Sequence, residues 1–123
     1  MSPIQHPVNG PAVLFDLGEE LDIVHTQLVK SSRAARTLVK NGSLRSTLIG
    51  LAAGGELATH SADGPITVIV LEGALDFGVE DKTWSLRRGS LLAVDAGVEH
   101  SARSTGGAIF LLTVSLSTKQ DGA

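Results

Sequence analysis

Residues 64–73 read Gly-Pro-Ile-Thr-Val-Ile-Val-Leu-Glu-Gly, and this stretch decides the fold. Ile, Val and Thr are branched at Cβ and favour strands, while Gly and Pro at the two ends interrupt regular structure. The stretch therefore predicts a strand over 66–72 that turns at Gly73. Apart from Thr67, residues 66–71 of this strand are apolar on both faces, so that one face fills a core. The other face, with Ile69 and Leu71, needs cover from a partner sheet, an N-terminal helix or a second subunit.

Similar short segments continue on both sides of this strand, separated by turn signals such as Asn41-Gly42. The predicted strands, about nine in all, cover residues 35–40, 44–51, 56–60, 66–72, 74–80, 82–87, 91–94, 99–103 and 108–116. Nothing in this order resembles the strand–helix alternation of a parallel sheet, so the sequence predicts an all-β antiparallel sandwich or barrel. The predicted core consists of Val68, Val70, Leu75, Phe77, Leu86, Phe110, Leu112 and Val114.

A single helix is predicted in front of the strands. Asp16-Leu17-Gly18-Glu19 has the pattern of a capping box, and apolar residues at helical spacing extend the helix from Leu17 to about Val24 or slightly beyond. His25 lies on or beside the apolar stripe. It is either a ligand or, more commonly for such a residue, a packed side chain with one partner. The expected organisation is an arm and helix over 1–34, a barrel over 35–116 and a loose polar tail over 117–123.

The composition narrows the classes of function. The chain has 123 residues, enough for one domain, and its aromatic fraction of 3% argues against base stacking with nucleic acid. It has no cysteine, which excludes disulfides, zinc–thiolate sites and iron–sulfur clusters. Neither a signal-peptide pattern nor an apolar run long enough to span a bilayer is visible. We therefore expect a cytoplasmic protein that binds neither nucleic acid nor membranes.

Charge is distributed unevenly along the chain. The stretch from Lys30 to Arg45 has five basic residues and no acidic one, and the stretch from Glu56 to Asp81 has six acidic residues and no Lys or Arg. The basic stretch could form an anion or nucleic-acid patch. We favour solvated strand faces that pair with the acidic segment, because the net charge is −3 and no aromatic residues are interleaved.

Two sets of residues have the spacing of a known motif pair. The first set is Gly54, His60, positions 62 and 66, and Gly73; the second is Gly89, Asp95, Gly97, His100 and Ser104. Over residues 35–116 the chain thereby resembles the cupins, in particular small bacterial single-domain cupins. The resemblance implies an RmlC-like jelly roll, which is a double-stranded antiparallel β-helix, with one short N-terminal helix in front.

The resemblance also implies a binding site, but one that departs from the family pattern. In cupins, two histidines and a glutamate of the first motif and one histidine of the second hold a divalent metal. The matching positions here are His60, Ala62, Ile66 and His100, so that two of the four ligands are replaced by apolar side chains. We expect these four residues to line one pocket at the barrel mouth. Asp95 stands at the family's proline position, and we expect it to cap its turn rather than bind metal.

The expected function is small-molecule binding in the barrel pocket, with a degenerate metal site, no resident cofactor and no identified catalytic residue. The alternative is a metal-dependent enzyme of the dioxygenase or isomerase type, in which His60 and His100 hold a divalent transition metal at low occupancy. A third hypothesis is a sensor or accessory subunit that acts through its dimer surface.

We also expect a homodimer, because an open barrel leaves edge strands and cupins resembling this one commonly associate through such edges. The rival is a monomer in which the helix from Leu17 covers Ile69 and Leu71.

Overall fold

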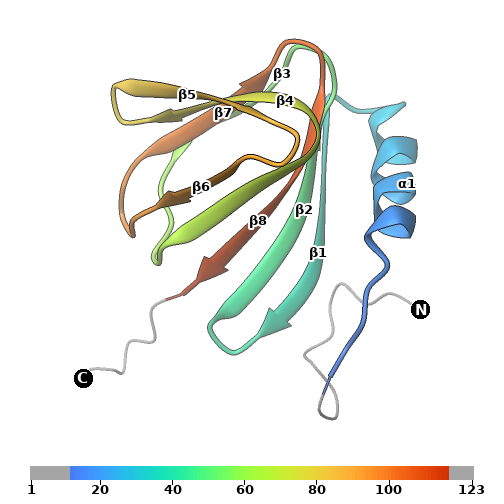
Figure 1. Ribbon diagram of the computed structural model, residues 1–123, viewed down its shortest axis with the longest axis horizontal. Coiled ribbons are helices and arrows are strands. Elements are labelled where there is room, and N and C mark those ends of the chain that lie inside the picture. Colours follow the sequence, from blue (N-terminus) through green and yellow to red (C-terminus); the bar gives the residue numbers. More distant parts are fainter. Residues whose placement is uncertain (1–11, 117–123) are drawn as a thin grey trace.

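The computed structural model describes residues 12–116, and the expectations for the first eleven residues and for the tail over 117–123 lie outside that range. One helix precedes eight strands (Figure 1). Their bounds are α1 Leu17–Leu28, β1 Arg33–Asn41, β2 Leu44–Leu51, β3 Gly55–His60, β4 Ile66–Val79, β5 Lys82–Arg87, β6 Leu91–Val94, β7 His100–Ser104 and β8 Ala108–Ser115.

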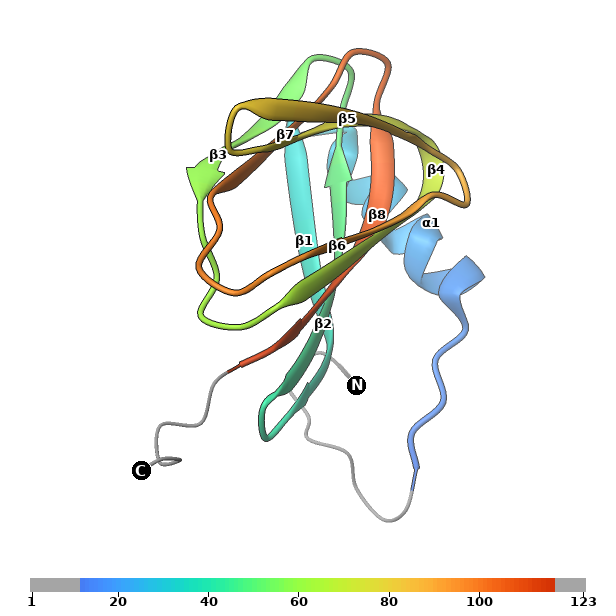
Figure 2. The ribbon, with the colours of Figure 1, turned by 60° about the vertical axis from the view of Figure 1, so that its left-hand side comes forward.

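The strands form two antiparallel layers that share β4. The first layer has the order β1-β2-β8-β4-β6, and the second has the order β3-β7-β4-β5. The first half of β4 pairs with β6 and β8, and its second half pairs with β5 and β7. The layers curl toward each other and enclose the barrel interior (Figure 2). The predicted all-β jelly-roll fold is confirmed.

The strand β4 corrects one expectation. Residues 66–72 and 74–80 were predicted as two strands joined by a turn at Gly73, but β4 runs unbroken through Gly73. The register with β8 shifts between Val70 and Glu72, which is a β-bulge, and Gly73 has a φ of 76°. A Cβ added at Gly73 would lie 2.1 Å from the carbonyl oxygen of Gly107, so the close approach of β4 and the β7–β8 turn requires glycine.

The barrel core agrees with the eight core residues predicted from the sequence. Seven of the eight predicted core residues are buried, and the eighth, Leu112, packs against the same cluster while partly exposed. Phe77 and Phe110 are its two largest fully buried side chains, at 1% and 0% exposure. Aliphatic side chains supply the remaining volume, as the low aromatic content requires.

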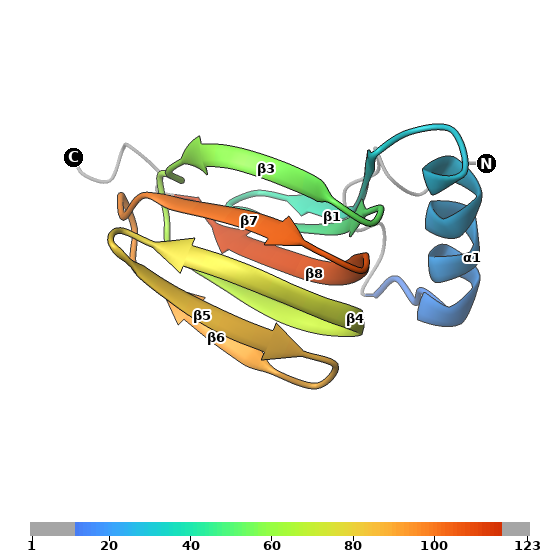
Figure 3. The same cartoon turned by 90° about the horizontal axis from the view of Figure 1, so that it is seen from above.

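Helix α1 packs on the outer surface of the first layer, beside the barrel (Figure 3). The Asp16 side chain caps the helix by accepting hydrogen bonds from the amides of Gly18 and Glu19, as predicted. A Cβ at Gly50 would come within 2.5 Å of a Val24 methyl carbon, so glycine in β2 allows the helix to approach. A second apolar cluster, Val24, Leu38, Leu48 and Ile109 with surrounding partly buried side chains that include Leu71, fills this interface.

The expected pairing of the basic and acidic segments is wrong for the described residues. The ion pair formed by the basic stretch joins Arg36 to Glu20 on α1, outside the acidic segment, and both side chains are largely buried. Arg36 points outward from β1 toward α1, on the side of the first layer that faces away from the second layer. Among residues 12–116 no helix is long and apolar enough to cross a membrane.

Candidate ligand-binding site

The pairing of β3 with β7 brings two histidines together. His60 ends β3 and His100 begins β7, and the two residues are register partners beside a bulge between Leu57 and His60. Their Nε2 atoms are 3.2 Å apart, and their rings meet edge to face with centroids 4.4 Å apart. Forty positions separate the two histidines in the sequence, and the spacing of the two cupin motifs is what predicted that they lie together.

Backbone hydrogen bonds fix the tautomer of both rings. The Nδ1 atom of His60 lies 3.1 Å from the Ala58 carbonyl oxygen, and that of His100 lies 3.1 Å from the Val98 carbonyl oxygen. A carbonyl oxygen only accepts, so each Nδ1 must carry the proton and donate it. In the neutral rings both Nε2 atoms are therefore bare lone pairs directed at each other. This arrangement calls for a proton, a ligand donor or a cation between the two nitrogens.

The two histidines differ in their surroundings. His100 is 3% exposed, and its ring stacks on Phe77 with centroids 5.6 Å apart, whereas His60 is exposed. Burial lowers the pKa of His100; the hydrogen bond to the Val98 carbonyl opposes this shift, and the nearby His60 adds to it. The pair is therefore open to solvent on the His60 side, and the lowered pKa favours the neutral form of the buried His100.

The other two predicted site residues are apolar neighbours. Ile66 is 2% exposed within the barrel core, and Ala62 packs against the same cluster while partly buried. Ile66 also borders an outer hollow of about 420 Å³, which is lined by Pro65, Ile66, Thr67, Ala93, Val94, Asp95, Thr113 and Ser115. Neither histidine lines that hollow. That all four residues line one binding cavity remains a prediction.

The residues present do not fit a tightly held metal. The 3.2 Å between the two Nε2 atoms is close to the roughly 3.3 Å expected for two nitrogen ligands of one tetrahedral ion. No group of three or more His, Cys, Asp or Glu side chains suited to a metal occurs within residues 12–116. Asp95 caps its turn as predicted, because its carboxylate accepts a hydrogen bond from the Ala96 amide at 2.8 Å. The histidine pair supplies two nitrogen ligands, fewer than the three or four protein ligands of a tightly held metal.

Arg45 is a further polar residue at this barrel, and its place in the basic stretch was the only sequence signal that pointed to it. Its register partner on β8 is Val114, and Val114 is also the partner of Ile66 on β4. Register partners share a face, and Val114 belongs to the barrel core, so Arg45 faces inward in the same cross-strand row as Ile66. Its Nε is buried and lacks a hydrogen-bond partner among the described residues.

Comparison with known proteins agrees with this architecture. The model of the cupin domain matches residues 47–115, and the chain belongs to the cupin family. A search of curated proteins gave no match.

Among solved structures, the chain is similar to a Streptococcus pyogenes protein of unknown function, with 25% identity, coverage of 96% and 97% of the two chains and a TM-score of 0.72. It is also similar to an RmlC-like cupin from Shewanella frigidimarina, with 23% identity, coverage of 77% and 85% and a TM-score of 0.67. A salicylate 1,2-dioxygenase variant from Pseudoaminobacter salicylatoxidans has the same fold over 91% of this chain and 37% of its own, with 21% identity and a TM-score of 0.78.

Proposed function

We propose that this cupin binds a small organic molecule in its barrel, with the polar end of the ligand at His60 and His100. The observation that carries the proposal is the pair of Nε2 lone pairs held 3.2 Å apart by backbone hydrogen bonds to both Nδ1 atoms. A hydroxyl or amide N–H on a ligand would relieve the repulsion between the lone pairs by donating to one or both. Apolar walls with a few fixed polar groups are the usual composition of small-molecule sites.

Arg45 favours a ligand that also carries a negative charge. A buried guanidinium nitrogen without a partner has lost its hydration, and a carboxylate on the ligand would restore that hydrogen bond with charge assistance. A single small molecule with a carboxylate and a hydroxyl would satisfy Arg45 and the histidine pair together. We therefore infer that the ligand is a hydroxy carboxylate with an apolar body.

4-Hydroxybenzoate is a suitable probe because its carboxylate and its hydroxyl lie at opposite ends of an aromatic ring, and phenol is the matched control without the carboxylate. We expect saturable binding of 4-hydroxybenzoate by calorimetry and much weaker binding of phenol. His100→Gln and Arg45→Met should each weaken 4-hydroxybenzoate binding by roughly tenfold or more, since each removes a hydrogen bond to a desolvated group. His25→Gln, which changes a histidine outside the barrel, should have no effect. Equal affinity in all four proteins would reject the proposed site.

The 3.2 Å separation supports one alternative, in which a divalent transition metal binds the two histidines and the protein acts as a metal-dependent enzyme. Elemental analysis of protein purified without chelators or an affinity tag tests this alternative: a stoichiometric metal would favour it over the proposal. Restoring the two missing ligands provides a second test. Ala62→His with Ile66→Glu should create affinity for Ni²⁺ or Zn²⁺ if the barrel positions correspond to the family motif.

A further inference from the structure

A second cavity lies outside the barrel, between helix α1 and the outer surface of the first layer. Its volume is about 300 Å³, at the lower end of the range for small-molecule pockets. The lining residues are His25, Leu28, Leu51, Ala52, Ala53, Glu72, Gly73, Gly106, Gly107, Ala108 and Ile109. The barrel histidines contribute nothing to it, and Gly73 is the one lining residue that belongs to the cupin motifs.

Glu72 reaches this cavity because of the bulge in β4. Val68 and Val70 point into the barrel, and strict alternation would direct Glu72 inward as well. The register shift after Val70 instead makes Ile109 the partner of Glu72, and Ile109 belongs to the cluster under the helix. Because of the bulge, the Glu72 carboxylate lies on the outer surface of the layer and not in the apolar core, where a regular strand would place it.

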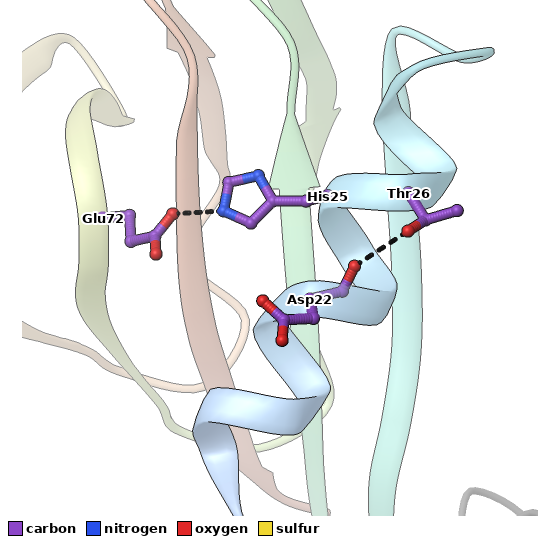
Figure 4. Close-up of polar contacts among 4 residues, drawn as sticks. All are labelled: Asp22, His25, Thr26 and Glu72. Carbon is purple, nitrogen blue, oxygen red and sulfur yellow. Dashed lines mark hydrogen bonds and ion pairs between the residues drawn. The ribbon is translucent and has the colours of Figure 1, made fainter.

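The carboxylate of Glu72 meets an imidazole from the helix. The Nε2 atom of His25 donates to Oε1 of Glu72 across 2.6 Å, and the two side chains are 55% and 40% exposed (Figure 4). A carboxylate only accepts, so this bond places the His25 proton on Nε2 and leaves Nδ1 as an acceptor in the neutral ring. Neither Nδ1 of His25 nor Oε2 of Glu72 has a hydrogen-bond partner among residues 12–116. The polar atoms of these two side chains that remain free to bind a ligand are therefore hydrogen-bond acceptors.

The rest of the cavity complements a cation with a short apolar body. His25 lies in the last turn of α1 and Leu28 ends it, so the cavity adjoins the partially negative end of the helix dipole. Leu28, Leu51 and Ile109 supply aliphatic wall. We propose that this cavity is a binding site for a small protonated primary amine, whose ammonium group donates to Glu72 and His25 while its alkyl or aryl part packs on the walls.

Three probes of matched size test the charge of the ligand: n-butylamine, n-butanol and butyrate. Backbone amide signals of Ala53, Gly106 and Gly107 report binding in ¹⁵N NMR titrations at neutral pH. We expect saturable shifts with n-butylamine, at least roughly tenfold weaker binding of n-butanol and no binding of butyrate. The absence of a saturable shift with n-butylamine would overturn the proposal, and so would tighter binding of n-butanol or butyrate.

Variants then assign the site. Glu72→Gln should weaken n-butylamine binding by roughly tenfold or more, whereas Glu56→Gln, at an exposed carboxylate on β3, should leave it unchanged. Ala53→Leu narrows the cavity without removing a polar group and should abolish binding. This second variant keeps the site testable if Glu72→Gln does not fold. His60→Gln should have no effect, so failure of the barrel site and failure of this site are separable. Unaltered n-butylamine binding in both Glu72→Gln and Ala53→Leu would reject the assignment.

Discussion

Replacing Phe77 tests how the barrel core controls the histidine pair. Phe77 is 1% exposed and stacks on His100 with the ring planes 17° apart. Removing a buried phenyl ring usually costs about 3–5 kcal/mol, so Phe77→Ala should lower the free energy of unfolding by that amount. At a urea slope of about 2 kcal/mol per M, a loss of about 4 kcal/mol lowers the unfolding midpoint by about 2 M.

The same substitution should alter the protonation of His100. Burial is the main cause of its lowered pKa, and the phenyl ring covers one face of the imidazole. Water admitted to the vacated space would stabilise the charged form, so the pKa of His100 should rise toward its ordinary value of 6.5 in Phe77→Ala. Proton NMR of the imidazole Hε1 across a pH titration measures this shift.

Phe110→Ala is the matched control. Phe110 is 0% exposed in the same cluster, but its register partners are Ile49 and Val70 rather than a histidine. It should lose similar stability without a change in the pKa of His100. Phe77→Leu, which should cost only about 1 kcal/mol, keeps the test available if Phe77→Ala does not fold. An equal pKa shift in the two alanine variants, or none in either, would show that stacking on Phe77 does not control His100.

Three further outcomes follow from the structure. Arg36→Met should lower the free energy of unfolding, measured in urea, by about 3–5 kcal/mol because it leaves the buried Glu20 carboxylate without its partner. Adding Glu20→Leu should recover most of that loss. A cost near zero for the single variant would mean that the pair is solvated. The contribution of neutral His100 to the free energy of unfolding should be complete above pH 6.5 and should be lost as the pH falls from 6.5 to the lowered pKa of His100, because the unfolded chain takes up the proton first. His100→Gln should flatten this pH dependence, and an unchanged profile would contradict the prediction. We propose a homodimer through the outer surface where Leu91, 65% exposed, pairs with Ile69: sedimentation equilibrium at tens of micromolar should give twice 12.7 kDa, Leu91→Lys should give the monomer, and a monomeric wild type would reject it.

Local patterns were sufficient to predict most of the fold. Turn signals between strand-forming segments placed β5, β6 and β8 close to their observed bounds, and Asp16 marked the start of α1. Motif spacing predicted that His60 and His100 would meet, although they are far apart in the chain. In each case the signal is confined to a few residues whose spacing the backbone geometry fixes.

The features that escaped prediction depend on how strands slide past each other. Gly73 has the same preference for positive φ in a turn and beside a bulge, so the sequence could not show that β4 continues. The bulge also determines the side to which Glu72 points, and the bulge exists only in the pairing of β4 with β8. Its bond to His25 spans 47 positions and needs the helix in place. Arg45 was likewise visible only as one of five basic residues until the register placed it opposite Val114.

Arg45, which lies in the row with Val114 and Ile66, supports our proposal of an anionic ligand rather than a metal cation. A carboxylate at position 66 would offset Arg45 and attract a divalent ion, but Ile66 provides no charge. Arg45 and a cation bound at the histidine pair would carry charges of the same sign and would repel each other. In the proposed complex the carboxylate of the ligand binds Arg45, and its donor group binds His60 and His100. The motif spacing places Ile66 at the family's glutamate position. Under the proposed function, this replacement removes a metal ligand and leaves Arg45 available to a carboxylate.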